Sequence, residues 1–123
     1  MRSAGLPLML FALLTAGGAA RAADLRGQTL YEARCGACHS IDVNRTGPLH
    51  RNVFGRVAGT AAGFAYSTAL RRSGIRWTAA NLDRWLQNPE ALVPGQAMDV
   101  TVPAKADRDL LIDYLRGVST PRQ

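Results

Sequence analysis

Cys35 and Cys38, the only two cysteines of the chain, are separated by two residues, and His39 follows the second one directly. Three kinds of chemistry use such a group. The thiols could form a redox-active dithiol, supply half of a zinc site, or attach a c-type haem whose iron binds the histidine. A structural disulfide explains the pair poorly, because so short a loop restricts the unfolded chain very little.

Haem attachment is the alternative that accounts for all three residues. A dithiol of the thioredoxin kind would lie between a strand and a helix, and no segment of this chain predicts such a unit. A zinc site would need a fourth ligand, for which the more distant His50 is the candidate. In a haem site each thiol forms a thioether with one vinyl group, and the next residue can bind iron through its imidazole. The motif therefore favours a haem.

Residues 1–22 have the features of a secretory signal peptide. Arg2 gives a positive start, an apolar run covers 6–14, and Ala20-Arg21-Ala22 is a small-x-small cleavage pattern. We expect a periplasmic protein with a single domain at 23–123. The alternative, an uncleaved membrane anchor, is disfavoured because the run is shorter than the roughly 20 residues of a spanning helix.

The charge balance limits the partners. The formal net charge is +6 and would fall to +4 when Arg2 and Arg21 leave with the signal peptide, and the basic residues are mostly arginines scattered along the sequence. A mild positive charge favours anionic partner surfaces. Since no basic cluster is interleaved with aromatic residues, we expect no nucleic-acid binding.

The hydrophobic periodicity predicts an all-α domain, because no segment alternates as a strand would. Between 40 and 62 the chain is rich in glycine and polar residues, which predicts a long loop that encloses something. The helical segments that we expect are 25–37, 67–72, a helix that Thr78 caps and that runs through 87, a turn at 89–92, and 105–118.

The same periodicity predicts which side chains face inward. Residues four positions apart in the first helix share one face, and the apolar residues of the later helices form stripes. The inward residues that we expect are Gly27, Tyr31 and Cys35, then Leu82, Trp85 and Leu86, then Leu110, Leu111, Tyr114, Leu115 and Val118.

Met98 bears on the choice between a carrier and an enzyme. It is the only methionine beyond residue 22, and the Pro94-Gly95 turn before it could present its thioether inward. A sulfur ligand opposite His39 would close the iron and suit electron transfer, whereas an open position would admit peroxide or a gas. Met98 could instead be an ordinary loop or core residue. His50 is the rival ligand, but it lies in the loop expected on the His39 side, so we expect it to be partly buried or at the surface.

Taken together, these motifs resemble the class I cytochromes c, in particular the mitochondrial form and its bacterial relatives. The resemblance covers nearly all of 23–123: GxxxY before CxxCH, then TGP, FGRVAG, GFAYS, SGIRW, a helix ending in NP, VPGxxM and DRxxLIxYL. It implies helices and loops wrapped around one covalently attached haem c. It further implies that the first and last helices cross at Gly27, with Tyr31 and Tyr114 packed nearby.

The resemblance also implies the roles of individual residues. Each role is carried over only to a position that matches a family motif. The implied site comprises Cys35 and Cys38 as covalent attachment points, His39 and Met98 as iron ligands, Pro48 as the acceptor of the histidine Nδ1–H, and Arg56, Tyr66 and Trp77 as donors to a haem propionate.

The implied function is that of a soluble monohaem electron carrier and not an enzyme. It would pass single electrons between periplasmic redox partners, such as a respiratory or photosynthetic complex, a dehydrogenase or an oxidase. We expect a monomer that contacts membranes only through partner complexes. The alternatives are a cytochrome subunit tethered to a larger dehydrogenase or oxidase, and a peroxidase-like or gas-binding protein if Met98 is labile.

The sequence departs from the family pattern near the expected haem. His50 stands where leucine is common, which predicts that the lining of the haem pocket on the His39 side differs from that of the family. Gln96 replaces a threonine that often bonds a propionate. Lysines that surround the mitochondrial haem edge are replaced here by Glu90, Ala91 and Ala97, although Arg34 is retained. We therefore expect weaker electrostatic docking to a mitochondrial-style oxidase.

Overall fold

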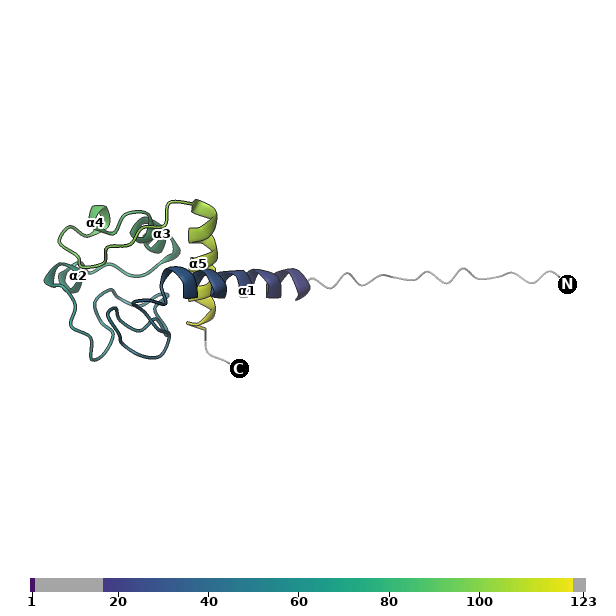
Figure 1. Cartoon of the computed structure of the whole chain (residues 1–123), viewed down its shortest axis with the longest axis horizontal. Helices are drawn as coiled ribbons and strands as arrows, with labels where there is room; N and C mark the ends of the chain where they lie inside the picture. Colours follow the sequence, from purple (N-terminus) through teal and green to yellow (C-terminus); the bar gives the residue numbers. More distant parts are fainter. Residues whose placement is uncertain (2–16, 121–123) are drawn as a thin grey trace.

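The computed structural model describes Met1 and residues 17–120, and its regular structure is helical (Figure 1). Within these residues there is no strand, and a single antiparallel bridge joins Val57 to Arg76. This confirms the predicted all-α architecture. The helices are α1 (Gly17–Arg34), α2 (Thr68–Arg72), α3 (Ala79–Gln87), α4 (Pro89–Leu92) and α5 (Lys105–Gly117).

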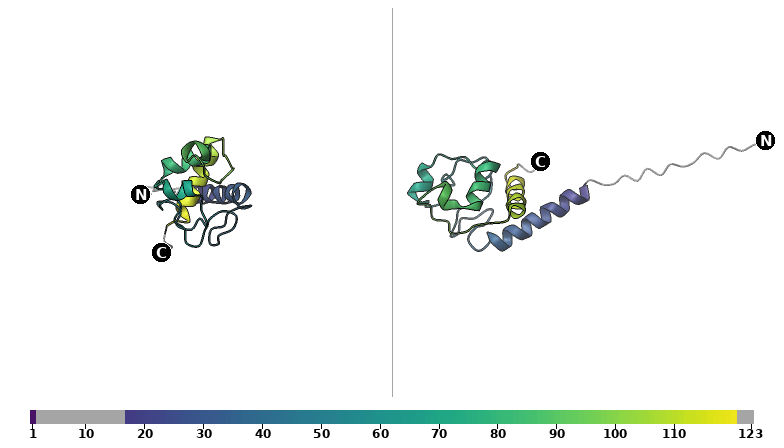
Figure 2. Two further views of the ribbon diagram at one scale, coloured as in Figure 1. Left: turned by 90° about the vertical axis from the view of Figure 1, so that its left-hand side faces the viewer. Right: turned by 90° about the horizontal axis from the view of Figure 1, so that it is seen from above.

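Helices α1 and α5 cross and pack against each other, as Figures 1 and 2 show from three directions. Gly27 and Tyr31 are the buried residues of α1. A Cβ atom added at Gly27 would lie 3.0 Å from the Leu110 carbonyl oxygen and 3.1 Å from the Tyr114 Cβ. A larger residue would therefore force the two helices apart by a few tenths of an ångström, so Gly27 is the small residue at the close approach that the resemblance implied.

The predicted bounds of the first helix, 25–37, are wrong at both ends, because α1 runs from Gly17 to Arg34. The alanine-rich segment before residue 25 contains good helix formers and no proline, so the helix extends through it. This extension projects from the domain (Figure 2), and residues 17–22 are exposed. Of the predicted signal peptide 1–22, residues 2–16 lie outside the described residues.

Helix α3 follows its prediction closely. The Thr78 hydroxyl accepts a hydrogen bond from the Asn81 N–H at 3.2 Å and so caps the first turn. Leu82, Trp85 and Leu86 are buried as expected. Helices α2 and α4 also agree with the predicted segments 67–72 and 89–92.

The buried face of α5 differs from the predicted stripe. Leu111 and Leu115 are buried as expected, but Leu110, Tyr114 and Val118 are only half-buried. Two further residues are buried on this helix, Arg108 and Ile112. The stripe is displaced because α5 must pack on α3 as well as on α1.

Arg108 is buried at only 5% exposure, and its Nε and Nη1 atoms have hydrogen-bond partners. Its Nε donates to Asp83 Oδ1 of α3 at 2.8 Å. Its Nη1 donates to the carbonyls of Val102 and Pro103 at 3.0 and 2.7 Å. A buried charge without such partners would be costly, so this cluster joins α5 to α3 and to the preceding loop.

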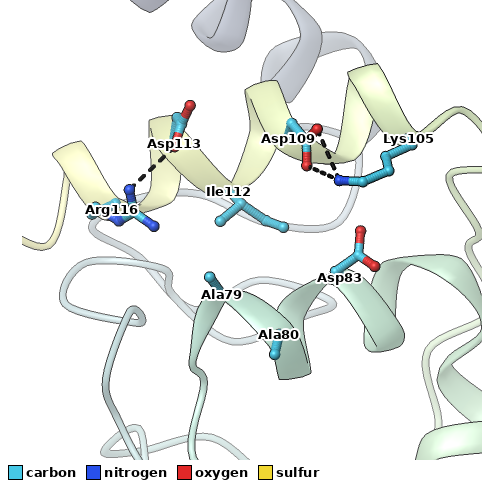
Figure 3. A pocket seen from close by; sticks show the side chains of 8 residues that line it. All are labelled: Ala79, Ala80, Asp83, Lys105, Asp109, Ile112, Asp113 and Arg116. Atoms are coloured by element: carbon cyan, nitrogen blue, oxygen red, sulfur yellow. Dashed lines mark hydrogen bonds and ion pairs between the residues drawn. The ribbon is translucent and has the colours of Figure 1, made fainter.

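A surface hollow lies between α3 and α5 (Figure 3). Its charged side chains are paired: Lys105 with Asp109, Arg116 with Asp113, and Asp83 with Arg108. None of the predicted site residues lines it. The lining residues are Ala79, Ala80, Asp83, Lys105, Asp109, Ile112, Asp113 and Arg116.

The segment 39–67 contains no helix and forms the predicted long loop. Backbone bonds fold it back on itself: the Gly47 N–H donates to the Cys38 carbonyl at 2.8 Å and the His50 N–H to the Ser40 carbonyl at 3.0 Å. The loop thereby returns to the end of α1, where the cysteines lie.

Candidate functional site

Cys35, Cys38 and His39 lie in a tight turn directly after α1. The His39 N–H donates to the Cys35 carbonyl at 2.8 Å, and the Cys38 N–H donates to the same oxygen at 3.1 Å. The Cys35 N–H still bonds the Tyr31 carbonyl of α1 at 2.8 Å. These bonds to the end of α1 therefore fix the backbone from which both thiols and the imidazole project.

Both cysteines are free thiols and are half-buried. Burial raises the pKa of the Cys35 thiol to about 11, an effect larger than those of the neighbouring Arg34 and Cys38. A redox-active dithiol needs a lowered pKa, because the thiolate is the nucleophile. The raised pKa of Cys35 therefore disfavours a redox-active dithiol.

The His39 ring is fixed by one hydrogen bond. Its Nδ1–H donates to the Pro48 carbonyl at 2.8 Å, the contact that the resemblance implied. Burial lowers the pKa of His39, which favours the neutral imidazole that a metal ligand requires. The proton on Nδ1 leaves the lone pair on Nε2 available.

Gly47 lies directly against this ring. A Cβ atom added there would come within 2.6 Å of both His39 ring nitrogens, which no real side chain could tolerate. The glycine of the TGP motif is therefore needed for the position of His39.

His50 is half-buried on the His39 side, as the sequence predicted, and its ring contacts the His39 ring. The two rings are stacked, with centroids 4.1 Å apart and planes inclined by 19°. The Nδ1 atom of His50 is 2.8 Å from the Tyr31 hydroxyl. Burial lowers the pKa of His50 to about 3, and His39 and Arg56 add to the effect, so the ring is neutral at pH 7.

This arrangement disfavours a zinc site. His50 stacks on His39 and uses Nδ1 with Tyr31, so it does not converge with the cysteines on a common point. In the described part of the chain no group of three or more His, Cys, Asp or Glu side chains is placed to hold a metal ion.

Arg56 presents an unmatched donor. Its Nη1 and Nη2 atoms donate to the carbonyls of Arg51 and Leu49, each at 3.1 Å. Its Nε–H is buried and has no hydrogen-bond partner. Burial lowers the Arg56 pKa, and nearby Tyr66 partly offsets this. Since unpaired buried donors are rare, the guanidinium calls for a further acceptor, and a carboxylate suits it well.

The other two predicted propionate donors lie near Arg56. Trp77 is buried, and its backbone N–H donates to the Arg56 backbone carbonyl at 2.9 Å. The Tyr66 hydroxyl accepts a bond from the Ala61 N–H at 3.1 Å, which leaves its own proton free to be donated. The structure thus brings Arg56, Tyr66 and Trp77 together, and the donor set fits an anionic group.

Met98 lies in the loop between α4 and α5. It is half-buried and packs against the core. Gly95, with φ of 89°, makes the turn that the sequence predicted before it. The Gln96 Oε1 accepts a hydrogen bond from the Met98 N–H, and the Gln96 Nε2 donates to Glu90. Gln96 therefore braces this loop.

Two features of the site were missed by sequence reasoning. The first is the stack of His50 on His39, whose only signal was a histidine in place of a leucine. The second is Asn44, whose Oδ1 accepts from the Leu49 N–H at 2.9 Å and whose Nδ2 donates to the Ala62 carbonyl at 2.9 Å. An asparagine in a glycine-rich loop is a general signal for such backbone bonds.

Sequence comparisons match the chain to one family. Residues 25–119 match the family model described as cytochrome c. Cytochrome c of Euglena viridis is 43% identical over 94 residues, which span 74% of this chain and 92% of that protein. Cytochrome c2 of Rhodomicrobium vannielii is 35% identical over 102 residues, spanning 80% and 81%. The cytochrome c-type protein cyt cy of Rhodobacter capsulatus is 43% identical over 91 residues, 72% of this chain but 46% of that protein.

A solved structure shows the same fold. Cytochrome cH from Methylobacterium extorquens superposes with a TM-score of 0.73 at 36% identity, covering 76% of this chain and 97% of that one. Proteins of this kind are electron carriers and not enzymes, and they hold one covalent haem c, which confirms both predictions. The matched residues and the shared fold place this chain in the cytochrome c family.

Proposed function

We propose that this monohaem electron carrier binds its iron through His39 on one side and Met98 on the other, with Cys35 and Cys38 as the thioether attachment points. The bond from His39 Nδ1–H to the Pro48 carbonyl carries the proposal. It holds the tautomer in which Nε2 is the free donor atom, beside the two thiols. The haem supplies an iron that gains and loses one electron.

The unmatched donors support a bound anionic cofactor. The buried Nε–H of Arg56 and the free hydroxyl proton of Tyr66 lie in one region, next to the buried Trp77. A haem propionate would accept these bonds and would offset the half-buried guanidinium charge. These residues therefore orient the cofactor and exclude water from its carboxylate.

Met98 is the proposed ligand on the other side. Its half-buried side chain packs against the core, and the Gly95 turn sets the path of its loop. A thioether opposite an imidazole favours a relatively high potential. With Met98 and His39 both bound, the iron would have no open position, which would suit electron transfer.

Optical spectra test the ligand set. The oxidised protein should show a sulfur-to-iron charge-transfer band that disappears in Met98→Ala. Val100→Ala, an exposed apolar position in the same loop, is the matched control and should keep the band. Rapid binding of cyanide or carbon monoxide by the unaltered protein would instead support the peroxidase-like or gas-binding alternative.

We further propose that the protein acts in the periplasm after cleavage near residue 22. Cleavage there would remove only exposed residues of α1 and would keep the buried Gly27 and Tyr31. Within the described residues, no helix is both long enough and apolar enough to cross a membrane. N-terminal sequencing of the periplasmic protein should begin near Ala23, and recovery of an uncleaved chain in the membrane fraction would refute this.

The chain exchanges electrons with protein redox partners. We propose that it does so as a monomer that docks on partner surfaces of opposite charge. Loss of Arg2 and Arg21 with residues 1–22 lowers the formal net charge from +6 to +4, because 6 − 2 = 4, and this charge still favours acidic partner surfaces. The rate of electron exchange with such a partner should therefore fall as ionic strength rises. A rate that does not depend on salt would contradict electrostatic docking, and light scattering would test the monomer.

A tethered subunit is the second candidate. The match to cyt cy spans only 46% of that protein, so a domain like this one also occurs within a longer chain. Stable co-purification of the native protein with a dehydrogenase or an oxidase would favour this candidate over the free carrier.

A further inference from the structure

His50 makes two directional contacts that a space-filling residue would not need. Its ring lies nearly parallel to the His39 ring at 4.1 Å, and its Nδ1 is 2.8 Å from the Tyr31 hydroxyl. The Tyr31 ring meets the His50 ring edge-on, with centroids 5.6 Å apart and an angle of 66°. The orientation of His50 is therefore fixed by contacts with both neighbours.

Tyr31 is itself a rigid anchor. Its side chain is 4% exposed and lies at the crossing of α1 and α5, where it contacts the Tyr114 ring at 5.0 Å. Its carbonyl accepts the Cys35 and Gly36 N–H groups at 2.8 and 3.1 Å. One residue of α1 thus holds both the attachment turn and, through His50, a face of the His39 ring.

We propose that His50 is a positioning residue for the iron ligand: held by Tyr31, it fixes the plane of the His39 imidazole and lowers the midpoint potential of the haem. The inference rests on the proposed function, since it requires His39 to bind the iron. Because His50 touches His39, it acts through that ligand.

The direction of the effect follows from charge. An imidazole bound to oxidised iron carries more positive charge than one bound to reduced iron. The face of a neutral aromatic ring attracts positive charge, so the stacked His50 stabilises the oxidised state more than the reduced state. A leucine at this position could fill the space but would offer neither the ring face nor the bond to Tyr31.

The first test is His50→Leu in the haem-loaded protein. We expect the equilibrium constant for reduction to rise about threefold to tenfold, which for one electron is ~30 to ~60 mV in midpoint potential. The paramagnetic resonance g-values of the oxidised iron, which report the orientation of the axial imidazole, should shift or broaden as well.

The second test separates the hydrogen bond from the packing. Tyr31→Phe removes only the hydroxyl that bonds His50, and we expect a smaller change in the same direction, with broadened g-values. Tyr114→Phe is the matched control, because within the described residues Tyr114 packs on Tyr31 and makes no ring contact or hydrogen bond with His50. It should leave potential and g-values unchanged.

The outcomes distinguish the two levels of the account. If the unaltered protein shows histidine and methionine ligation but His50→Leu changes neither potential nor g-values, the inference is overturned. If the unaltered protein lacks imidazole ligation, the proposed function fails first. Should His50→Leu not load haem, the difference between Tyr31→Phe and Tyr114→Phe decides, and equal spectra and potentials would overturn the inference.

Discussion

The crossing of α1 and α5 is held by packing within the chain, whereas the loop 39–67 contains polar atoms that lack a partner among the described residues. At the crossing, Gly27 allows backbone contact, and Tyr31, Leu111 and Leu115 are buried. In the loop, Arg56 has a buried N–H without a partner, and His39 keeps Nε2 free. The helices at the crossing pack against other parts of the chain, whereas the loop carries polar atoms that have no partner within the described part of the chain.

This contrast shows where the cofactor contributes to stability. A domain of this size buries a modest apolar core, and a tightly bound group can complete it. The helical crossing should persist as local structure without haem, while the loop should depend on it. The predictions below test the two regions and, last, a contact between α3 and α5 that lies outside both.

The largest effect is expected from preventing attachment. Cys35→Ala/Cys38→Ala should yield a chain without a cooperative thermal transition, because the loop loses the group around which it folds. Circular dichroism in the near ultraviolet would measure this, with the haem-loaded protein as reference. Hydrogen exchange should show more protection in α1 and α5 than in 39–67. A cooperative transition in the haem-free chain would contradict the contrast.

Gly47→Ala tests the loop alone. The new Cβ would overlap the His39 ring, so the ring or the loop must move. We expect a loss of about 3 kcal/mol in the free energy of unfolding, with a disturbed absorption spectrum of the haem. Gly117→Ala, where an added Cβ meets nothing, is the control for chemical denaturation. An unchanged spectrum in Gly47→Ala would show that the contact is unimportant.

Gly27→Val tests the crossing alone. The side chain would press on the Leu110 carbonyl and Tyr114. We expect a loss of about 2 kcal/mol in the free energy of unfolding, with an unchanged haem spectrum. Gln28→Val changes the neighbouring exposed position and serves as the control. If Gly27→Val altered the iron ligands, the two regions would not be separable.

Asp83→Ala should have the smallest effect of the series. It leaves the Arg108 guanidinium buried with two carbonyl partners and no carboxylate. Because Asp83 is itself partly exposed, we expect about 1.5 kcal/mol in denaturant unfolding, less than a fully buried pair would cost. Asp109→Ala, which breaks an exposed pair with Lys105, should be indistinguishable from the unaltered protein.

Helix bounds were predictable where the signal is local. Thr78 as a cap and the proline after Asn88 fix α3, and the observed helix agrees. The end of α1 was missed because Cys35 and His39 continue helix-like bonds beyond Arg34, so the four-residue spacing persists past the helix. Its start was missed because alanine-rich segments extend a helix without a marked boundary.

The site was predictable only in part. The pattern of Cys35, Cys38 and His39 indicates the cofactor, since covalent attachment requires those residue types at that spacing. The burial of Arg108 and the stack of His50 on His39 were not predictable. Both depend on contacts between segments distant in sequence, to Asp83 of α3 and across the closed loop.

A redox titration of the purified haem protein, followed by optical spectroscopy, tests the central claim most directly. Ligation by His39 and Met98 predicts a single one-electron transition at a relatively high potential. It also predicts that the sulfur-to-iron band is present in the oxidised form and is lost on reduction. A low potential with no such band, or more than one transition, would contradict an iron closed by these two residues.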